Sequence, residues 1–196
     1  MSNDKAFLIV GLGNPGAGYS ANRHNVGQMA LDVLASRIGS SFKRAKTTAV
    51  VAEGRLVVGA GVAQKVVLAK STGYMNTSGG PVSALLKFYD VPLSNLIVLH
   101  DELDIDAEKI RLKQGGGHGG HNGLRDIIAA CGSNDFARVR IGIGRPPGNM
   151  DTADFVLRDF SSTERKELPT TLEIAADAVE AIIAEGVAKA TMRFHV

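Results

Sequence analysis

The sequence has no tryptophan and a single cysteine, Cys131. One cysteine cannot form a disulfide within the chain, which is typical of proteins in a reducing compartment. No apolar run approaches the roughly 18 residues that a membrane span requires, and the sequence shows no secretion signal at its start. It also lacks the Gly-Lys-Ser/Thr of a P-loop and the Gly-x-Ser-x-Gly elbow of many serine hydrolases. We therefore expect a cytoplasmic protein with no membrane partner and neither of those two enzyme types.

The composition that is present fits one globular domain. The 196 residues are 44% hydrophobic and 21% charged, and we expect them to form a single domain over residues 1–196. Glycine is abundant, with 23 residues against an average of about 7%. The net charge of +2 is unevenly distributed, because residues 1–146 carry +6 and residues 147–196 carry −4. A near-neutral total therefore does not exclude an RNA ligand.

Short apolar runs alternate with helical patterns along the chain. The pattern predicts strands and helices in turn, with strands at 6–10, 48–52, 56–58, 66–69, 96–99, 110–113 and 138–143 and helices at 26–38, 82–89, 124–131 and 172–183. Such alternation predicts a single-domain α/β fold of three layers, with a mixed, mostly parallel twisted sheet covered by helices on both faces. We expect the close-set strands between residues 48 and 69 to form the antiparallel part.

The loop after the first strand, Gly11-Leu-Gly-Asn-Pro-Gly16, matches the G-x-G-x-x-G pattern of dinucleotide-binding proteins. Three features argue against that interpretation. Pro15 lacks the backbone N–H that a pyrophosphate would use, and the next helix opens about eight residues too late. No acidic residue ends a second strand where the ribose would bind. The sequence therefore predicts no dinucleotide cofactor.

His24 and Asp101 are the strongest candidates for catalysis. The loop that leads to His24 follows the first strand, and Asp101 follows the strand at residues 96–99. Ligands of open α/β sheets bind beyond the carboxyl ends of strands, so we expect the two residues to meet there. An aspartate beside a histidine orients the ring as a general base. Taken alone, each residue also suits a structural role, as a helix cap, a surface residue or a turn former.

The segment from His118 to Gly123 offers two interpretations. His118 and His121 form an H-x-x-H pair, but zinc needs three or four ligands and no clear third one follows. The alternative is a tight backbone platform, in which glycines allow a ligand to approach and Asn122 provides a donor and an acceptor.

Basic residues bracket this glycine cluster, namely Lys113, Arg138, Arg140 and Arg145. Arg138 and Arg140 lie two apart on an expected strand, so their side chains share one face. Such charges are usually only solvated, but here they flank the candidate site, where a phosphate anchor would be useful.

Together these segments resemble bacterial-type peptidyl-tRNA hydrolase over nearly the whole chain. The resemblance rests on motifs in a fixed order, which are Gly11-Leu-Gly-Asn-Pro-Gly16 with Tyr19 and Arg23-His24-Asn25-Val-Gly27, Tyr74-Met75-Asn76 with Ser78-Gly79, His100-Asp101-Glu102-Leu-Asp104, Arg111-Leu-Lys113 through Gly115-Gly-Gly and Gly119-Gly-His121-Asn122-Gly-Leu-Arg125, and the shorter Arg140-Ile-Gly-Ile-Gly-Arg-Pro146. One departure is that Ser71 and Gly73 stand where proline and threonine are usual.

The resemblance implies an enzyme that cleaves the ester between a peptide and the 3′ ribose of tRNA. It implies that His24 is the general base that activates water, with Asp101 as its orienting partner. It further implies a monomer without metal or other cofactor, whose partner is peptidyl-tRNA.

The resemblance also implies a set of substrate-binding residues. Asn14 and Asn76 would bind and align the substrate, and Asn122 would position the peptide or the water. Tyr19 and Met75 would shape the pocket for the terminal nucleotide. Lys113 and Arg140 would clamp the 5′ phosphate of the tRNA.

Two other functions stay open at this point. One is a non-catalytic RNA-binding homologue, of the kind that supports RNA splicing in plant organelles. The other is a metal-dependent esterase that uses His118 and His121. Both His24 and Asp101 are present, which favours the hydrolase.

Overall fold

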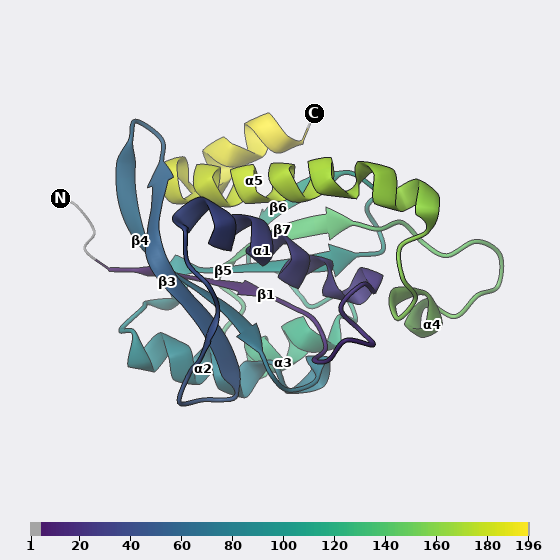
Figure 1. Cartoon of the computed structure of the whole chain (residues 1–196), viewed down its shortest axis with the longest axis horizontal. Coiled ribbons are helices and arrows are strands. Elements are labelled where there is room, and N and C mark those ends of the chain that lie inside the picture. The colour runs from purple at the N-terminus through teal and green to yellow at the C-terminus, as the bar shows by residue number, and fades with distance from the viewer. Residues whose placement is uncertain (1–4, 196) are drawn as a thin grey trace.

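A single mixed sheet runs through the middle of the molecule (Figure 1). Within residues 5–195, which the computed structural model describes, seven strands pair in the order β2-β3-β4-β1-β5-β7-β6. The start of the chain, where the sequence shows no secretion signal, lies outside these residues. The strands are β1 (Phe7–Gly11), β2 (Lys43–Arg44), β3 (Ala49–Val58), β4 (Val62–Ser71), β5 (Leu96–Glu102), β6 (Ile110–Gln114) and β7 (Ala137–Gly142).

The four central strands are parallel, and the two edges of the sheet are antiparallel. β1 pairs in parallel with β4 and β5, and β5 pairs in parallel with β7. β2, β3 and β4 form an antiparallel edge, and β6 pairs antiparallel with β7 at the other. The prediction of a mixed sheet with its antiparallel part between residues 48 and 69 is therefore confirmed.

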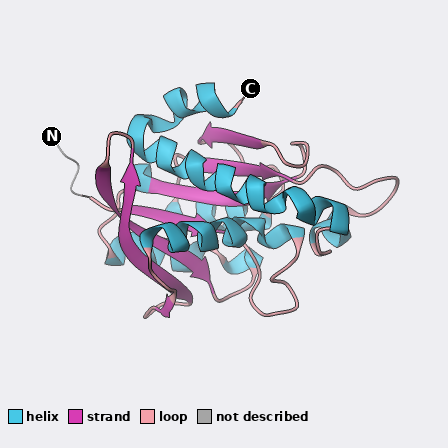
Figure 2. Ribbon diagram, turned by 45° about the horizontal axis from the view of Figure 1, so that its top comes forward, coloured by secondary structure: helices cyan, strands magenta, loops and turns pink. Residues whose placement is uncertain are grey.

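Helices cover both faces of the sheet, which gives the three layers expected (Figure 2). The longer helices are α1 (Val26–Ile38), α2 (Gly79–Phe88), α3 (Asn122–Cys131) and α5 (Ser162–Phe194). α1 and α5 pack on one face, where Leu31, Leu34 and Val179 are completely buried. α2 and α3 pack on the other, around Leu85 and Ile127. No helix among residues 5–195 is both long and apolar enough to cross a membrane.

The sequence missed several short elements. These are β2, the helix α4 (Thr152–Val156) and three 3-10 turns, η1 (Arg23–Asn25), η2 (Met75–Thr77) and η3 (Leu93–Asn95). These elements are two to five residues long, which is too short for a periodic pattern to be recognised. Two of the missed turns, η1 and η2, carry candidate site residues.

The runs predicted at 48–52 and 56–58 are parts of one continuous strand, β3, in which Gly54 joins them. Gly54 pairs in register with Val66 and does not interrupt the ladder. A Cβ atom at Gly54 would lie 3.1 Å from the side chain of Ile38, at the end of α1. The glycine therefore makes room for α1 on the sheet and is not a turn.

The helix predicted at 172–183 is the middle of the much longer α5. Ser161 and Glu164 form a capping box that starts the helix well before the apolar stripe. Gly186 departs from helical geometry with φ 82°, and beyond it the chain packs along the edge strand β6. There the backbone N–H of Leu112 donates to Nε2 of His195 at 2.6 Å, which occupies part of the open strand edge.

Two glycines bring α1 against the carboxyl ends of the central strands. A Cβ atom at Gly27 would lie 2.3 Å from the carbonyl oxygen of Leu99, and one at Gly11 would lie 2.4 Å from that of Gly27. The backbones of β1, β5 and α1 therefore touch at a point where no other residue fits. Because η1 comes directly before α1, this contact also fixes where His24 lies.

We expect Gly27→Ala to lower the free energy of unfolding by about 3 kcal/mol, the upper end of the usual cost of overpacking. For a chain of this size the melting temperature should fall by roughly 6–12 °C, measured by thermal unfolding. Gly18→Ala is the matched control, because nothing lies within 4 Å of a Cβ atom there. Equal melting temperatures for the two variants would contradict the close contact.

Candidate active site

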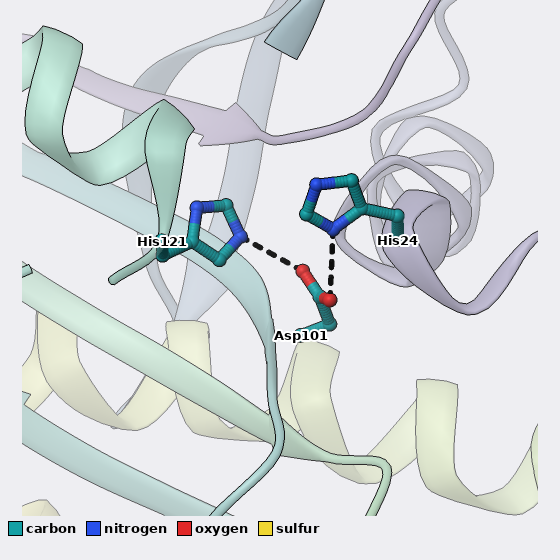
Figure 3. Close-up of side chains that lie close together, drawn as sticks. All are labelled: His24, Asp101 and His121. Carbon is teal, nitrogen blue, oxygen red and sulfur yellow. Dashed lines mark hydrogen bonds and ion pairs between the residues drawn. The ribbon is translucent and has the colours of Figure 1, made fainter. Parts of the chain in front are cut away.

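His24 and Asp101 meet at the carboxyl end of the sheet, as their positions after β1 and at the end of β5 predict. Nδ1 of His24 lies 2.9 Å from Oδ2 of Asp101 (Figure 3). η1 carries the histidine at the entry to α1, and β5 carries the aspartate. Asp101 is 4% exposed, so its carboxyl group is held almost entirely out of water.

The contact sets the tautomer and the basicity of His24. With Nδ1–H donating to Asp101, the lone pair is on Nε2, and no residue in the described range 5–195 hydrogen-bonds that nitrogen. Burial lowers the pKa of His24, but the charge of Asp101 and its hydrogen bond outweigh burial and raise the pKa above its ordinary value. For Asp101, burial acts in the opposite direction and raises the pKa. The charges and hydrogen bonds of His24 and His121 outweigh burial and lower the pKa of Asp101 well below its ordinary value, so the carboxyl stays ionised.

A second histidine, His121, binds the other oxygen of the same carboxylate. Its Nε2 lies 2.8 Å from Oδ1 of Asp101. Its Nδ1 accepts from the backbone N–H groups of Gly123 and Leu124, so His121 also caps the N-terminus of α3. Two N–H groups directed at Nδ1 place the ring proton on Nε2, which donates to Asp101. The sequence singled out His121 only as half of a metal pair and missed this role.

Among residues 5–195, His24, Asp101 and His121 are the group that could hold a metal ion, since their ligand atoms lie within 4.8 Å of one another. The donor chemistry does not fit. Nε2 of His121 carries the proton, so it has no lone pair for a metal unless the cap of α3 breaks. His118 is not in this group, and its Nδ1 accepts from the backbone N–H of Gly120. His118 and His121 therefore do not form the metal pair that was the less favoured interpretation of this segment.

A third histidine, His100, is buried beside Asp101 and His121. Its Nδ1 lies 2.7 Å from the backbone oxygen of Asp101, and its ring centroid lies 5.1 Å from that of His121. Burial above all lowers the pKa of His100 to about 3, so the ring is neutral and Nδ1–H donates to that oxygen. Nε2 of His100 is buried without a hydrogen-bond partner among residues 5–195.

Asn14 joins the glycine loop after β1 to the turn that carries Met75. Its backbone exchanges two hydrogen bonds of 2.9 Å with the side chain of Asn25. Its Oδ1 accepts from the backbone N–H of Met75 at 2.7 Å. The Nδ2 group of Asn14 has no partner among the described residues, so it is the part of this side chain that remains for a ligand.

Ser71 and Gly73, the unusual residues before η2, form a turn of their own. The backbone N–H of Gly73 donates to Oγ of Ser71 at 3.0 Å. Ser78 fixes the other side of η2 by donating to the carbonyl of Met75 at 2.6 Å. Together with Asn14, these contacts hold the turn that presents Asn76.

A cleft of about 600 Å³ lies above His24 and Asp101. Six predicted site residues line it: Asn14, His24, Met75, Asn76, Asp101 and Asn122. Tyr19 does not, but its ring centroid lies 6.2 Å from that of Tyr74, which does. A larger groove of about 680 Å³ between β2 and α2 contains none of the predicted site residues.

The buried Arg23 fixes one wall of the cleft. It binds Glu164 through two hydrogen bonds, donates to the carbonyls of Phe155 and Arg158, and lies 4.0 Å from the centroid of the Phe155 ring. These contacts tie η1 to α4, whose Thr152 and Ala153 line the cleft. These contacts therefore hold η1, the turn that carries His24, against this wall of the cleft.

Lys113 and Arg140 lie outside the cleft, on β6 and β7. Lys113 pairs with Arg138 in register, and Arg140 lies two residues further along the same strand. Facing and alternate residues point to one side of a sheet, so the three side chains share a face, with Lys113 and Arg140 about 7–8 Å apart. Nε of Arg140 is buried without a partner in the described part of the chain. The shared face predicted for Arg138 and Arg140 is confirmed.

Comparisons with known proteins agree over the whole length of the chain. A family profile described as peptidyl-tRNA hydrolase matches residues 8–196. Curated proteins named peptidyl-tRNA hydrolase are 60% identical over 189 residues in Arthrobacter sp. (strain FB24) and 61% identical over 189 residues in Leifsonia xyli, each match covering 96% of both chains. The crystal structure of peptidyl-tRNA hydrolase from Acinetobacter baumannii is similar with a TM-score of 0.87 and 36% identity, over 99% of this chain and 96% of that one.

We expect Asp101→Asn to lower the pKa of His24. The substitution removes the negative charge that raises this pKa and leaves burial, which lowers it. A titration of the His24 ring by NMR measures the change directly. Asp104→Asn is the matched control, because Asp104 is exposed and pairs with Arg145. An unchanged His24 titration in Asp101→Asn would show that the carboxylate does not set the basicity of the ring.

Proposed function

The chain belongs to the peptidyl-tRNA hydrolase family and hydrolyses peptidyl-tRNA, and from this premise we propose that a water molecule deprotonated by His24 cleaves the ester. The reaction releases the peptide as a free acid and the tRNA with a free 3′ hydroxyl. The observation that carries the proposal is the hydrogen bond between Nδ1 of His24 and the buried carboxylate of Asp101, which leaves Nε2 as the base.

Proton transfer follows from this geometry. Nε2 of His24 takes a proton from water as the oxygen attacks the ester carbonyl. The imidazolium that forms is stabilised by Asp101, which stays ionised throughout. The same nitrogen then returns the proton to the 3′ oxygen of the ribose as the ester bond breaks. A positioned base of this kind contributes about 10²–10⁴-fold to the rate.

Three side-chain amides line the cleft that also contains His24. Nδ2 of Asn14 has no protein partner in the described chain and belongs to a side chain that lines the cleft. Asn76 and Asn122 line the same cleft from η2 and from the start of α3. We assign Asn14 and Asn76 to substrate alignment and Asn122 to the peptide or the water, because amide N–H groups bind carbonyl oxygens.

The RNA end of the substrate extends from the cleft toward two further regions. Tyr19 and Met75 lie beside the loop and turn that border the cleft, and we assign them to the terminal nucleotide, whose base and sugar suit aromatic and apolar contacts. Lys113 and Arg140 share a sheet face outside the cleft, and we assign them to the 5′ phosphate of the tRNA. Binding should therefore weaken as the salt concentration rises.

The mechanism needs no metal, and we propose that the enzyme acts as a cytoplasmic monomer. The protonated Nε2 of His121 supports the metal-free mechanism, because it removes one ligand from the group that could hold an ion. A non-catalytic RNA-binding homologue is not favoured. The relatives described above are named hydrolases, and both His24 and Asp101 are in place.

We expect His24→Ala to lower kcat for release of peptide from peptidyl-tRNA by at least about 100-fold, the lower end of what a positioned general base supplies. Single-turnover hydrolysis at saturating enzyme measures this loss without a contribution from binding. A tRNA-binding assay on the same variant should show affinity close to that of the unsubstituted protein.

The controls separate this mechanism from the alternatives. Unchanged turnover in His24→Ala would exclude His24 as the base. A loss of activity with 1,10-phenanthroline, with Mg²⁺ kept in excess so that the tRNA stays folded, would favour the metal-dependent esterase. RNA binding by the unsubstituted protein without ester cleavage would identify a non-catalytic homologue.

A further inference from the structure

Arg138 is a buried cation that the mechanism does not use. It is 1% exposed, and its guanidinium donates to three backbone carbonyls and to no carboxylate among residues 5–195. Nη1 donates to Gly117 and Nη2 to Gly116, both at 2.6 Å, and Nη2 also reaches Asn134 at 3.3 Å. Burying a charge costs free energy unless hydrogen bonds compensate it, and here three backbone carbonyls do so. The segments to which these carbonyls belong therefore indicate the role of the arginine.

The carbonyls belong to a loop that cannot hold its own shape. Glycines occupy five of the six positions from 115 to 120, and Gly115, Gly116, Gly119 and Gly120 have positive φ. The loop therefore has almost no side chains that could pack against the protein. Glycine also has more backbone freedom than any other residue type, so the loop needs contacts from outside to hold one conformation. Apart from the two short bonds from Arg138, the loop is tied to the sheet by the backbone N–H of Gly115, which donates to the carbonyl of Phe136.

The loop in turn determines where Lys113 lies. A Cβ atom at Gly116 would come within 2.5 Å of Cε and 2.6 Å of Nζ of Lys113, so the end of the lysine lies directly against this glycine. Lys113 also faces Arg138 across the β6–β7 pair. The arginine, the glycine loop and the lysine are thus stacked on one face of the sheet edge.

The charge of Arg138 acts at the same place. Burial and the neighbouring Arg140 lower the pKa of Arg138, although a guanidinium keeps its charge at any physiological pH. Nε of Arg138 and Nε of Arg140 are both buried without partners in the described chain. No acidic side chain neutralises Arg138 in the described chain, so its field adds to that of Lys113 and Arg140.

We propose that Arg138 is a positioning residue for RNA binding, which fixes the glycine loop and, through Gly116, holds the Lys113 ammonium where the 5′ phosphate of the tRNA binds. This inference rests on the assignment of Lys113 and Arg140 to that phosphate. Arg138 does not itself touch the phosphate, because its two terminal nitrogens are occupied by the loop carbonyls.

The test compares two substrates that differ only at the 5′ end of the tRNA, one with a phosphate and one with a hydroxyl. Arg138→Met should raise KM for the phosphorylated substrate by about 10-fold, the size of one charge-assisted hydrogen bond. Turnover of the hydroxyl substrate should stay within about twofold, because His24 and Asp101 are held by other elements. Arg138→Lys should not restore the preference, since one ammonium cannot bond both carbonyls in the geometry of a guanidinium.

A second variant tests the loop while leaving Arg138 intact. Gly116→Ala places a methyl group on the end of Lys113 and should remove the preference for the phosphate in the same way. Gly115→Ala is the matched control, because Gly115 also has positive φ, at 70°, and no atom lies closer than 3.7 Å to its Cβ position. This pair answers the question even if Arg138→Met fails to fold.

The outcomes distinguish this inference from the proposed function. If Lys113→Ala loses the preference for the phosphate and Arg138→Met and Gly116→Ala keep it, the positioning role is wrong and the phosphate assignment stands. If the unsubstituted enzyme shows no preference for the phosphate, the assignment fails and the positioning role fails with it. An equal loss on both substrates in Arg138→Met, or full rescue by Arg138→Lys, would also overturn the positioning role. In Lys113→Ala, adding Arg138→Met should cause no further loss of preference.

Discussion

The active site depends on one buried carboxylate held between two imidazoles. Asp101 receives a hydrogen bond on each oxygen, at 2.9 Å from His24 and 2.8 Å from His121. An isolated charge at this depth would be costly, and these two bonds offset the cost. The three residues come from β5, η1 and the N-terminus of α3, so the carboxylate also fixes how these elements meet. The same bonds set the tautomer of His24 and leave Nε2 facing the cleft.

Two buried arginines hold segments that lie around this centre. Arg23 holds α4 against η1 through the carbonyls of Phe155 and Arg158 and the carboxylate of Glu164. Arg138 holds the glycine loop through the carbonyls of Gly116 and Gly117. In both places a planar guanidinium binds backbone carbonyls of a segment that lies outside the sheet. His24 and Asp101 are thus placed by η1 and β5, and the segments around them are held by charge-assisted hydrogen bonds.

Local patterns predicted much of this architecture. The helix at residues 26–38 and the meeting of His24 with Asp101 follow from periodicity and from the rule for strand ends, which need only nearby sequence. Contacts between distant segments were missed or misread. The reason for a glycine at position 54 was missed because Ile38, which needs its space, lies 16 residues earlier. The role of His121 was missed because its partners are the backbone of α3 and a carboxylate 20 residues away. Arg138 lies on the face predicted for it, yet it is buried because the glycine loop folds over it.

The central claim is that the unprotonated Nε2 of His24 performs the chemistry under the control of Asp101. The most direct test is to measure the single-turnover rate of peptidyl-tRNA hydrolysis against pH and the titration of the His24 ring by NMR in the same buffer. Because only the deprotonated ring is a base and its pKa is raised, the rate should fall as the pH drops through a midpoint above 6.5. This kinetic midpoint should coincide with the pKa of His24. A rate that stays constant while the His24 ring becomes protonated would contradict it.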